Sequence, residues 1–355
     1  MHKENQVSAL LIQWYHVNKR DLPWRDTQDP YKIWISEIIL QQTRVNQGLD
    51  YYNRFIARFP NVKTLAEASE EDVLKLWQGL GYYSRARNLH KAAKQIATNH
   101  QGVFPKEYND IISLSGIGTY TAAAISSFAY DLPFAAVDGN VYRVLSRIFG
   151  IDTPIDSLAG NKTFQQLAQD ILDNNHPGTH NQAIMEFGAL QCIPASPDCE
   201  SCPMKNICIS FANNLTGILP VKTKKIKTRK RYFNYLFIRN KKHTYLQKRT
   251  GDDVWKNLYE FPLIEDDRLL EANELFLHED FRNITTGISS EITIKSLSQP
   301  VKHVLTHQQI FAQFFLIEIS ELNERISQFE ETEITGIEKY PVSRLMDLFI
   351  KNHLG

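Results

Sequence analysis

The sequence predicts two domains, a mostly helical N-terminal domain and an α+β C-terminal domain. Its 355 residues suffice for two cores at about 150 residues per domain. Apolar residues three and four positions apart recur through residues 1–215, which is the pattern of amphipathic helices. A basic segment, residues 216–231, predicts an interdomain linker, and strand-like apolar runs follow it in residues 232–355.

The composition is typical of a soluble globular protein, with 43% apolar and 23% charged residues. The absence of any run of 18 or more apolar residues argues against a transmembrane helix, and the start MHKENQVSAL lacks a basic-then-apolar leader. We therefore expect an intracellular protein. The formal net charge is zero, but residues 1–231 carry 26 basic and 21 acidic side chains, against 14 and 19 in the remainder. This distribution favours nucleic-acid binding by the helical domain.

The first predicted helix spans residues 7–17 and ends before the turn DLPWR at residues 21–25. Trp24 in this turn is expected to pack into the protein. By itself, Arg25 would be interpreted as a solvated surface charge.

A second helix is predicted over residues 34–43, WISEIILQQT, with Gln42 on the same side as the isoleucines. Glu37 lies inside this apolar run, where burial disfavours the charged carboxylate and raises its pKa. By itself, such a glutamate would be interpreted as the partner of a buried arginine or of a capping group.

A third helix is predicted over residues 67–78 and a glycine-rich turn over residues 79–88, GLGYYSRARN. The helix after this turn has a basic face, which is either solvated or in contact with a nucleic-acid backbone. Tyr82, next to the glycines, is a candidate contact.

Residues 114–118, LSGIG, predict a tight turn between helices, because glycine adopts positive φ without steric cost. Thr119 is expected to cap the helix that follows, over residues 121–130. Backbone N–H groups at such a turn, beside a helix N-terminus, form a ready site for an anion such as a nucleic-acid phosphate. The alternative is an ordinary helix–turn–helix with no ligand.

The four cysteines of the chain follow a helix predicted over residues 181–190 and have the spacing C-x6-C-x2-C-x5-C. In an intracellular protein a metal site is favoured over disulfides. Four thiolates suit either structural zinc or a [4Fe–4S] cluster, and the spacing alone does not separate these two.

In the C-terminal domain, strands are predicted from Tyr232 and over residues 310–319, and a closing helix over residues 341–350. Thr306 and His307 immediately precede the second strand. By themselves they would be interpreted as turn residues of a hairpin.

The hairpin LxGIG and the segment VDGNVxR resemble the helix–hairpin–helix Gly/Pro–Asp superfamily of DNA glycosylases. The segments WxSExxLQQT and GLGYYxRAxNL resemble its MutY adenine DNA glycosylase family, and the cysteine spacing resembles the cluster loop of endonuclease III and MutY. Residues 254–262 resemble a segment of MutT-like, or Nudix, domains, but the REx2EE arrangement for Mg²⁺ is missing, so we predict no pyrophosphohydrolase activity.

The resemblance implies an all-α helix–hairpin–helix DNA glycosylase domain with an iron–sulfur cluster loop, followed by an α+β Nudix-like domain. It further implies removal of adenine paired with 8-oxoguanine or guanine in double-stranded DNA by a monomer, cytoplasmic and associated with the nucleoid. The resemblance also implies that Glu37 is the general acid and that Asp138 is the second catalytic carboxylate. Tyr120 takes the position of the endonuclease III lysine, and since a phenol cannot form an imine, base removal without strand cleavage is expected. Tyr120 either bonds the active-site carboxylate or packs in its helix.

The resemblance assigns the remaining residues in two sets. The DNA-binding set comprises Arg25, Gln42, Thr43, Tyr82, Gly116, Gly118, Asn140, Gln182, Thr306 and His307. The [4Fe–4S] ligands are Cys192, Cys199, Cys202 and Cys208. The competing hypotheses are an endonuclease III-like glycosylase for another base and a non-catalytic protein that binds damage or senses through its cluster.

Overall fold

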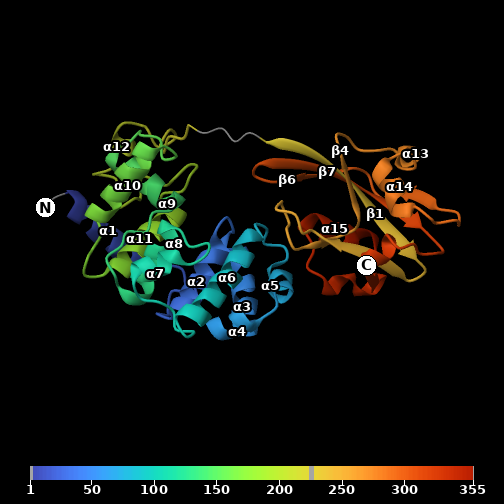
Figure 1. Ribbon diagram of the computed structural model, residues 1–355. Helices are drawn as coiled ribbons and strands as arrows, with labels where there is room; N and C mark the ends of the chain where they lie inside the picture. Colours follow the sequence, from blue (N-terminus) through green and yellow to red (C-terminus); the bar gives the residue numbers. More distant parts are fainter. Residues whose placement is uncertain (1–2, 224–227, 355) are drawn as a thin grey trace. The chain divides into compact units, whose positions relative to one another are not determined.

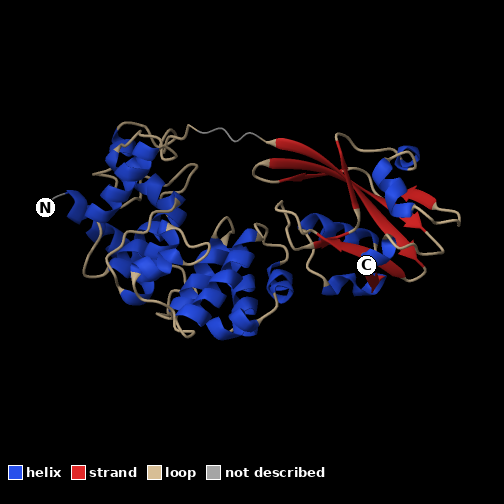
Figure 2. Ribbon diagram, viewed as in Figure 1, coloured by secondary structure: helices blue, strands red, loops and turns tan. Residues whose placement is uncertain are grey.

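A computed structural model describes residues 3–223 and 228–354 of the chain. The chain forms two compact units, one of residues 1–67 with 88–224 and the other of residues 68–87 with 225–355. The first unit is helical and the second contains a sheet with helices (Figures 1 and 2). The predicted combination of a helical domain with an α+β domain is therefore confirmed. Part of the predicted linker, residues 224–227, lies outside the described residues.

The first unit is built from helices joined by short loops. These are α1 Lys3–Asn18, α2 Pro30–Leu40, α3 Val45–Arg58, α4 Val62–Glu67, α6 Ser84–Asn99 (from Asn88 on), α7 Tyr108–Ser113, α8 Thr119–Tyr130, α9 Gly139–Phe149, α10 Leu158–Asp170, α11 Pro177–Leu190 and α12 Ile209–Ala212. Within the described residues, no helix of the chain is both long and apolar enough to cross a membrane.

One core holds α1, α9, α10 and α11 together. Leu11, Val144, Phe164 and Phe187 are fully buried in it. Burying side chains of this size stabilises the unit by about 1.5–3 kcal/mol each. This core fixes the beginning of α9 beside α11, and both helices contribute side chains to the site described below.

The predicted hairpin joins α7 to α8. Gly116 has a φ of +77°, and a Cβ added there would lie 2.6 Å from the Cβ of Asn88. A side chain at this position would therefore meet both backbone strain and a steric clash. Gly118 is the N-cap of α8, with φ −97°, and nothing lies within 4 Å of a Cβ built on it. The predicted capping role of Thr119 is wrong, because extended Gly118 takes the cap and Thr119 is already the first helical residue.

Two predicted helix boundaries are also wrong. The helix predicted over residues 34–43 ends at Leu40, because the chain turns before α3 and Gln42 adopts a φ of +58°. The helix predicted over residues 67–78 is interrupted where Ser69 caps α5, Glu70–Trp77, through a bond from the Asp72 amide. Both breaks place polar residues in turns.

The second unit holds an eight-stranded sheet with the order β3-β2-β1-β7-β5, in which β4 pairs with β1, β6 with β7 and β8 with β2. Long strands β1 and β7 run parallel through its centre. The strands are β1 Arg229–Asn240, β2 His243–Lys248, β3 Tyr259–Glu260, β4 Leu263–Asp266, β5 Thr293–Ser296, β6 Val301–Val304, β7 Gln308–Glu318 and β8 Glu330–Glu333. The helices are α5, α13 Ala272–Leu275, α14 Glu279–Thr285 and α15 Arg344–His353, with 3-10 turns at Ile326–Gln328 and Ile334–Lys339. Strand β1 begins at Arg229, within the segment that was predicted to be linker.

Candidate active site

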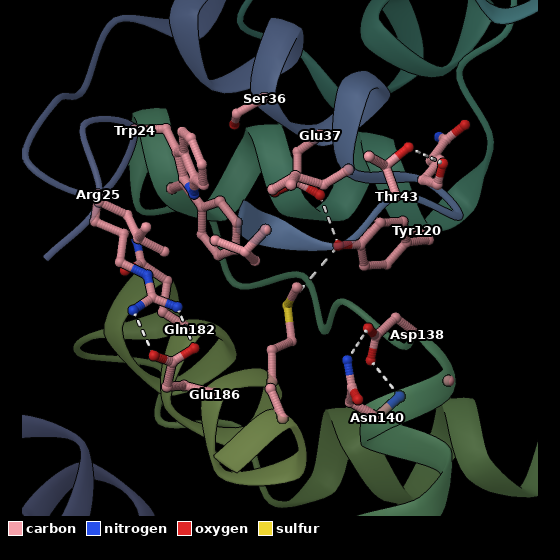
Figure 3. A pocket seen from close by; sticks show the side chains of 18 of the residues that line it. Trp24, Arg25, Ser36, Glu37, Thr43, Tyr120, Asp138, Asn140, Gln182 and Glu186 are labelled. Carbon is pink, nitrogen blue, oxygen red and sulfur yellow. Dashed lines mark hydrogen bonds and ion pairs between the residues drawn. The ribbon is translucent and has the colours of Figure 1, made fainter. Parts of the chain in front are cut away.

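A pocket of about 480 Å³ opens in the first unit where α2, α8, α9 and α11 meet (Figure 3). The polar side chains that line it come from segments far apart in the sequence. The lining includes Arg20, Trp24, Arg25, Glu37, Gln41, Gln42, Thr43, Tyr120, Asp138, Asn140, Gln182, Met185 and Glu186.

Glu37 points into this pocket from α2 and is only 7% exposed. The hydroxyl of Tyr120 donates a hydrogen bond of 2.6 Å to its Oε2. Burial, with a smaller contribution from the charge of Asp138, raises the pKa of Glu37 from 4.5 to about 7, against the lowering effects of the Tyr120 bond and Arg25. At neutral pH a large fraction of the Glu37 carboxyl is therefore protonated and can donate its proton.

Tyr120 projects from α8 between Glu37 and Met185, whose Sδ lies 3.9 Å from the hydroxyl (Figure 3). Burial, together with the neighbouring carboxyls, raises the pKa of Tyr120 well above 10. The phenol thus stays neutral and acts as a hydrogen-bond donor rather than as an amine-like nucleophile.

Asp138 is the N-cap of α9. Its Oδ1 accepts bonds of 2.8 Å from the amides of Asn140 and Val141, and its Oδ2 accepts one of 2.8 Å from Asn140 Nδ2. Burial raises the pKa of Asp138, while these three donors oppose that effect. Among the described residues, Glu37 receives one such bond and Asp138 receives three, so of the two carboxyls Asp138 loses its proton first.

Asn140 also connects Asp138 to the cysteine loop. Its Oδ1 accepts a 2.8 Å bond from Arg143 Nη2, and Arg143 Nε donates a 2.7 Å bond to the Cys192 carbonyl. The position of the Asp138 carboxylate is thereby tied to the start of the cysteine loop.

A third group of polar side chains lies on the α11 side of the pocket. Gln182 accepts a 2.5 Å bond from the hydroxyl of Tyr15, and Arg25 is paired with Glu186 (Figure 3). The sequence had indicated Arg25 and Gln182, but it did not indicate Arg20 or Glu186, which also line the pocket. Glu186 stands inside the apolar run AIMEFGAL, which is the same local signal that had indicated Glu37.

The remaining predicted DNA contacts lie elsewhere. Gly116 and Gly118 are exposed on the hairpin of the first unit. In the second unit, Tyr82 Oη and Thr306 Oγ1 are 2.8 Å apart, and the His307 carbonyl accepts a bond from the Arg229 amide. Tyr82 has a φ of +49° and is 49% exposed, so it is a large aromatic side chain held outward on a strained turn.

The four cysteines share the loop between α11 and α12. Burial, together with repulsion from the other three sulfurs, Cys192 among them, raises the pKa of Cys202 to about 12. Arg147 Nη1 lies 3.5 Å from Cys192 Sγ. Such crowded, partly buried thiols fit a cationic iron–sulfur or metal centre, which relieves the repulsion between thiolates. Within residues 3–223 and 228–354, no three His, Cys, Asp or Glu side chains are arranged to hold a single metal ion.

Comparison with known proteins agrees with this geometry. Residues 35–169 match the family model of the HhH-GPD superfamily base excision DNA repair protein, and residues 234–352 match that of the NUDIX domain. A solved structure of a thermostable thymine-DNA glycosylase aligns with 59% of this chain and 98% of its own, at 28% identity and a TM-score of 0.56. The fold and the two-carboxyl pocket thus define a helix–hairpin–helix DNA glycosylase, a hydrolase of N-glycosidic bonds that acts in base-excision repair.

Curated relatives show to which family of DNA glycosylases the chain belongs. An adenine DNA glycosylase of Buchnera aphidicola from Acyrthosiphon pisum is 33% identical over 97% of this chain and 98% of its own length. The human adenine DNA glycosylase is 41% identical over 56% of this chain and 38% of its own length. The chain belongs to the adenine DNA glycosylase family.

Proposed function

We propose that this enzyme hydrolyses the N-glycosidic bond of adenine that is paired with 8-oxoguanine, or with guanine, in duplex DNA. The observation that carries the proposal is the pair Glu37 and Asp138 in one pocket, with unequal numbers of hydrogen-bond donors. Two carboxyls whose environments separate their protonation states can serve as acid and as anion in the same reaction.

The glycosidic bond of a stacked adenine is not accessible, so the base is flipped out of the duplex into the pocket. The pocket of about 480 Å³ has the size of a small-molecule site and combines apolar walls with a few polar groups. Arg25 and Gln182 supply polar groups to the base. The hairpin at Gly116 and Gly118 offers backbone N–H groups to a DNA phosphate.

In the reaction, protonated Glu37 donates to adenine N7 and makes the base a better leaving group. Ionised Asp138 stabilises the oxocarbenium-like sugar or bonds to it transiently, as in retaining glycosidases. Water then completes the hydrolysis. Tyr120 orients the Glu37 carboxyl through the 2.6 Å bond.

We assign recognition of the base opposite adenine to Tyr82, Thr306 and His307, with Gln42 and Thr43 near the flipped base. The enzyme is expected to act as a monomer in the cytoplasm, associated with the nucleoid. An endonuclease III-like activity is disfavoured because the phenol of Tyr120 cannot form an imine with the sugar, as an amine can. A protein that only binds DNA is disfavoured because both carboxyls, Glu37 and Asp138, are present in the pocket.

Single-turnover excision on duplexes that pair adenine with 8-oxoguanine, guanine or thymine tests the proposal. We expect fast loss of adenine opposite 8-oxoguanine, slower loss opposite guanine and none opposite thymine. Strand breaks should appear only after treatment with alkali. Equal rates on all three duplexes would contradict the substrate assignment, and breaks without alkali would contradict the interpretation of Tyr120.

Tyr120→Phe removes the hydroxyl that donates a hydrogen bond to Glu37. In the wild type this bond lowers the pKa of the Glu37 carboxyl. The pKa of Glu37 should therefore rise in the variant, and the alkaline limb of the excision rate should move to higher pH. The measurement is single-turnover excision between pH 5 and 9 for both proteins, with Tyr130→Phe as a control, since its hydroxyl bonds the Phe104 carbonyl instead. An unmoved alkaline limb would show that Tyr120 only packs.

We further propose that the four cysteines hold a [4Fe–4S] cluster, which stabilises their loop and is not required for the proton transfers themselves. Purified protein should contain about four irons per chain. Cys202→Ser should lose most of this iron and the visible absorption, and its loop should become sensitive to protease. Ser201→Ala, which only removes a bond to Asp198, is the matched control. One zinc per chain in place of iron would overturn the assignment.

A further inference from the structure

One carboxylate in the pocket wall, Glu186 on α11, has no part in the chemistry described above. Its side chain is 1% exposed, and it pairs with Arg20 and Arg25, which are 34% and 11% exposed. It accepts five hydrogen bonds in total. Although burial alone would raise the pKa of Glu186, the bonds from Arg20 and Arg25 lower it to about 2, so it is ionised at every pH at which the enzyme would work.

These five bonds hold both ends of the loop segment 20–25. Arg20 contributes its backbone amide at 3.0 Å and its Nε and Nη2 at 2.8 and 2.6 Å. Arg25 contributes Nη1 and Nη2 at 2.8 and 2.5 Å. The Arg25 Nη1 also donates to the Arg20 carbonyl at 3.0 Å. One buried anion thus determines the path of a loop whose own sequence, RDLPWR, has no regular structure.

The same bonds determine the direction of the Arg25 guanidinium. The bonds to Glu186 and to the Arg20 carbonyl use both hydrogens of Arg25 Nη1 and one of Nη2, and the described residues form no further hydrogen bond with its Nε–H or its second Nη2–H. These two groups form one edge of the planar guanidinium and are suited to two acceptors in one plane. Arg25 and Glu186 both line the pocket that holds Glu37 (Figure 3). The ring of Tyr15, 5.7 Å from the Arg25 guanidinium carbon, limits its movement on another side.

We propose that Glu186 is a positioning residue that fixes the Arg25 guanidinium in the pocket wall and directs its remaining N–H edge toward the flipped-out base. Arg20 supplies the second positive charge and fastens the beginning of the loop. The inference rests on the proposed function, because the occupant of the pocket is the adenine base. Without the carboxylate, Arg25 would face Arg20 with no anion between them and would leave this orientation.

The test is a double-mutant cycle on a duplex that pairs adenine with 8-oxoguanine, measured by single-turnover excision. Glu186→Gln should slow excision by about 10- to 100-fold, because a misplaced positioning group costs about this much. Arg25→Met should slow it to a similar extent. Since Glu186 acts through Arg25, the double variant should be slower than Arg25→Met by no more than about threefold. Affinity for the uncleaved duplex, measured below the pH range of activity, should change less than the rate does.

Three controls separate positioning from simple destabilisation. Glu186→Asp keeps the charge and should recover a substantial part of the rate that Glu186→Gln loses. Glu67→Gln makes the same chemical change at an exposed position of the first unit and should excise at the wild-type rate. Thermal unfolding and iron content establish that each variant is folded.

The inference would be overturned if the double variant slowed excision by the product of the two single effects, those of Glu186→Gln and Arg25→Met. A wild-type excision rate in folded Glu186→Gln would also overturn it. These results differ from a failure of the proposed function, in which the wild-type enzyme itself would not release adenine.

Discussion

Replacing Asp138 by asparagine is expected to slow single-turnover adenine excision by about 10²- to 10³-fold. The ionised carboxylate stabilises positive charge that develops on the sugar, and preorganised electrostatic groups of this kind contribute about 10²–10³ each. Asparagine retains an oxygen that accepts from the amides of Asn140 and Val141, so it remains a good N-cap for α9.

Duplex affinity and thermal stability should therefore change little in Asp138→Asn. A parallel loss of DNA binding and stability would show that Asp138 is a structural cap and not a catalytic group. Asp173→Asn is a useful control, because Asp173 likewise caps a turn through a backbone amide but lies outside the pocket.

Glu37→Gln is expected to reduce excision by about 10²–10⁴, the contribution typical of a general acid. The amide has almost the same shape and still accepts the bond from Tyr120, but it has no acidic proton to give to adenine N7. Normal excision by this variant in single-turnover kinetics would exclude Glu37 as the acid.

The same variant should be more stable than the wild type at alkaline pH. The folded-state pKa of Glu37 is raised from 4.5 to about 7, so the wild type loses stability as the pH rises from about 4.5 through 7. This difference corresponds to about 3 kcal/mol at most. Urea unfolding of Glu37→Gln and wild type should give equal free energies near pH 4.5 and a higher value for the variant at pH 8. A destabilised variant at pH 8 would show that the carboxylate is structurally required in its charged form.

The sequence predicted those site residues whose surroundings are formed by residues close to them in the chain. Glu37 is buried because neighbouring isoleucines on its own helix face the core, and Asp138 caps a helix through bonds to the next residues. Gly116 takes the positive φ that its turn requires. Each of these features follows from a few adjacent residues.

What the sequence did not predict depends on distant partners. Glu186 and Arg25 are 161 residues apart in the sequence, and no periodic pattern predicts that they form an ion pair. The helix predicted over residues 34–43 stops at Leu40 although Gln41 and Gln42 are compatible with a helix, because the tertiary path requires a turn there. The backbone conformation of these polar residues at the pocket rim is thus determined by the tertiary structure more than by their intrinsic helix propensities.

The most direct test of the two-carboxyl account is the pH dependence of single-turnover excision by the wild-type enzyme on an adenine:8-oxoguanine duplex. Because Glu37 must be protonated and its pKa is about 7, the rate should fall about tenfold per pH unit well above pH 7. Because Asp138 must be ionised, the rate should also fall on the acid side, and Glu37→Gln should lose the alkaline limb. A rate that stays constant or rises from pH 6 to pH 9 would contradict the role of Glu37 as general acid, and with it the central claim.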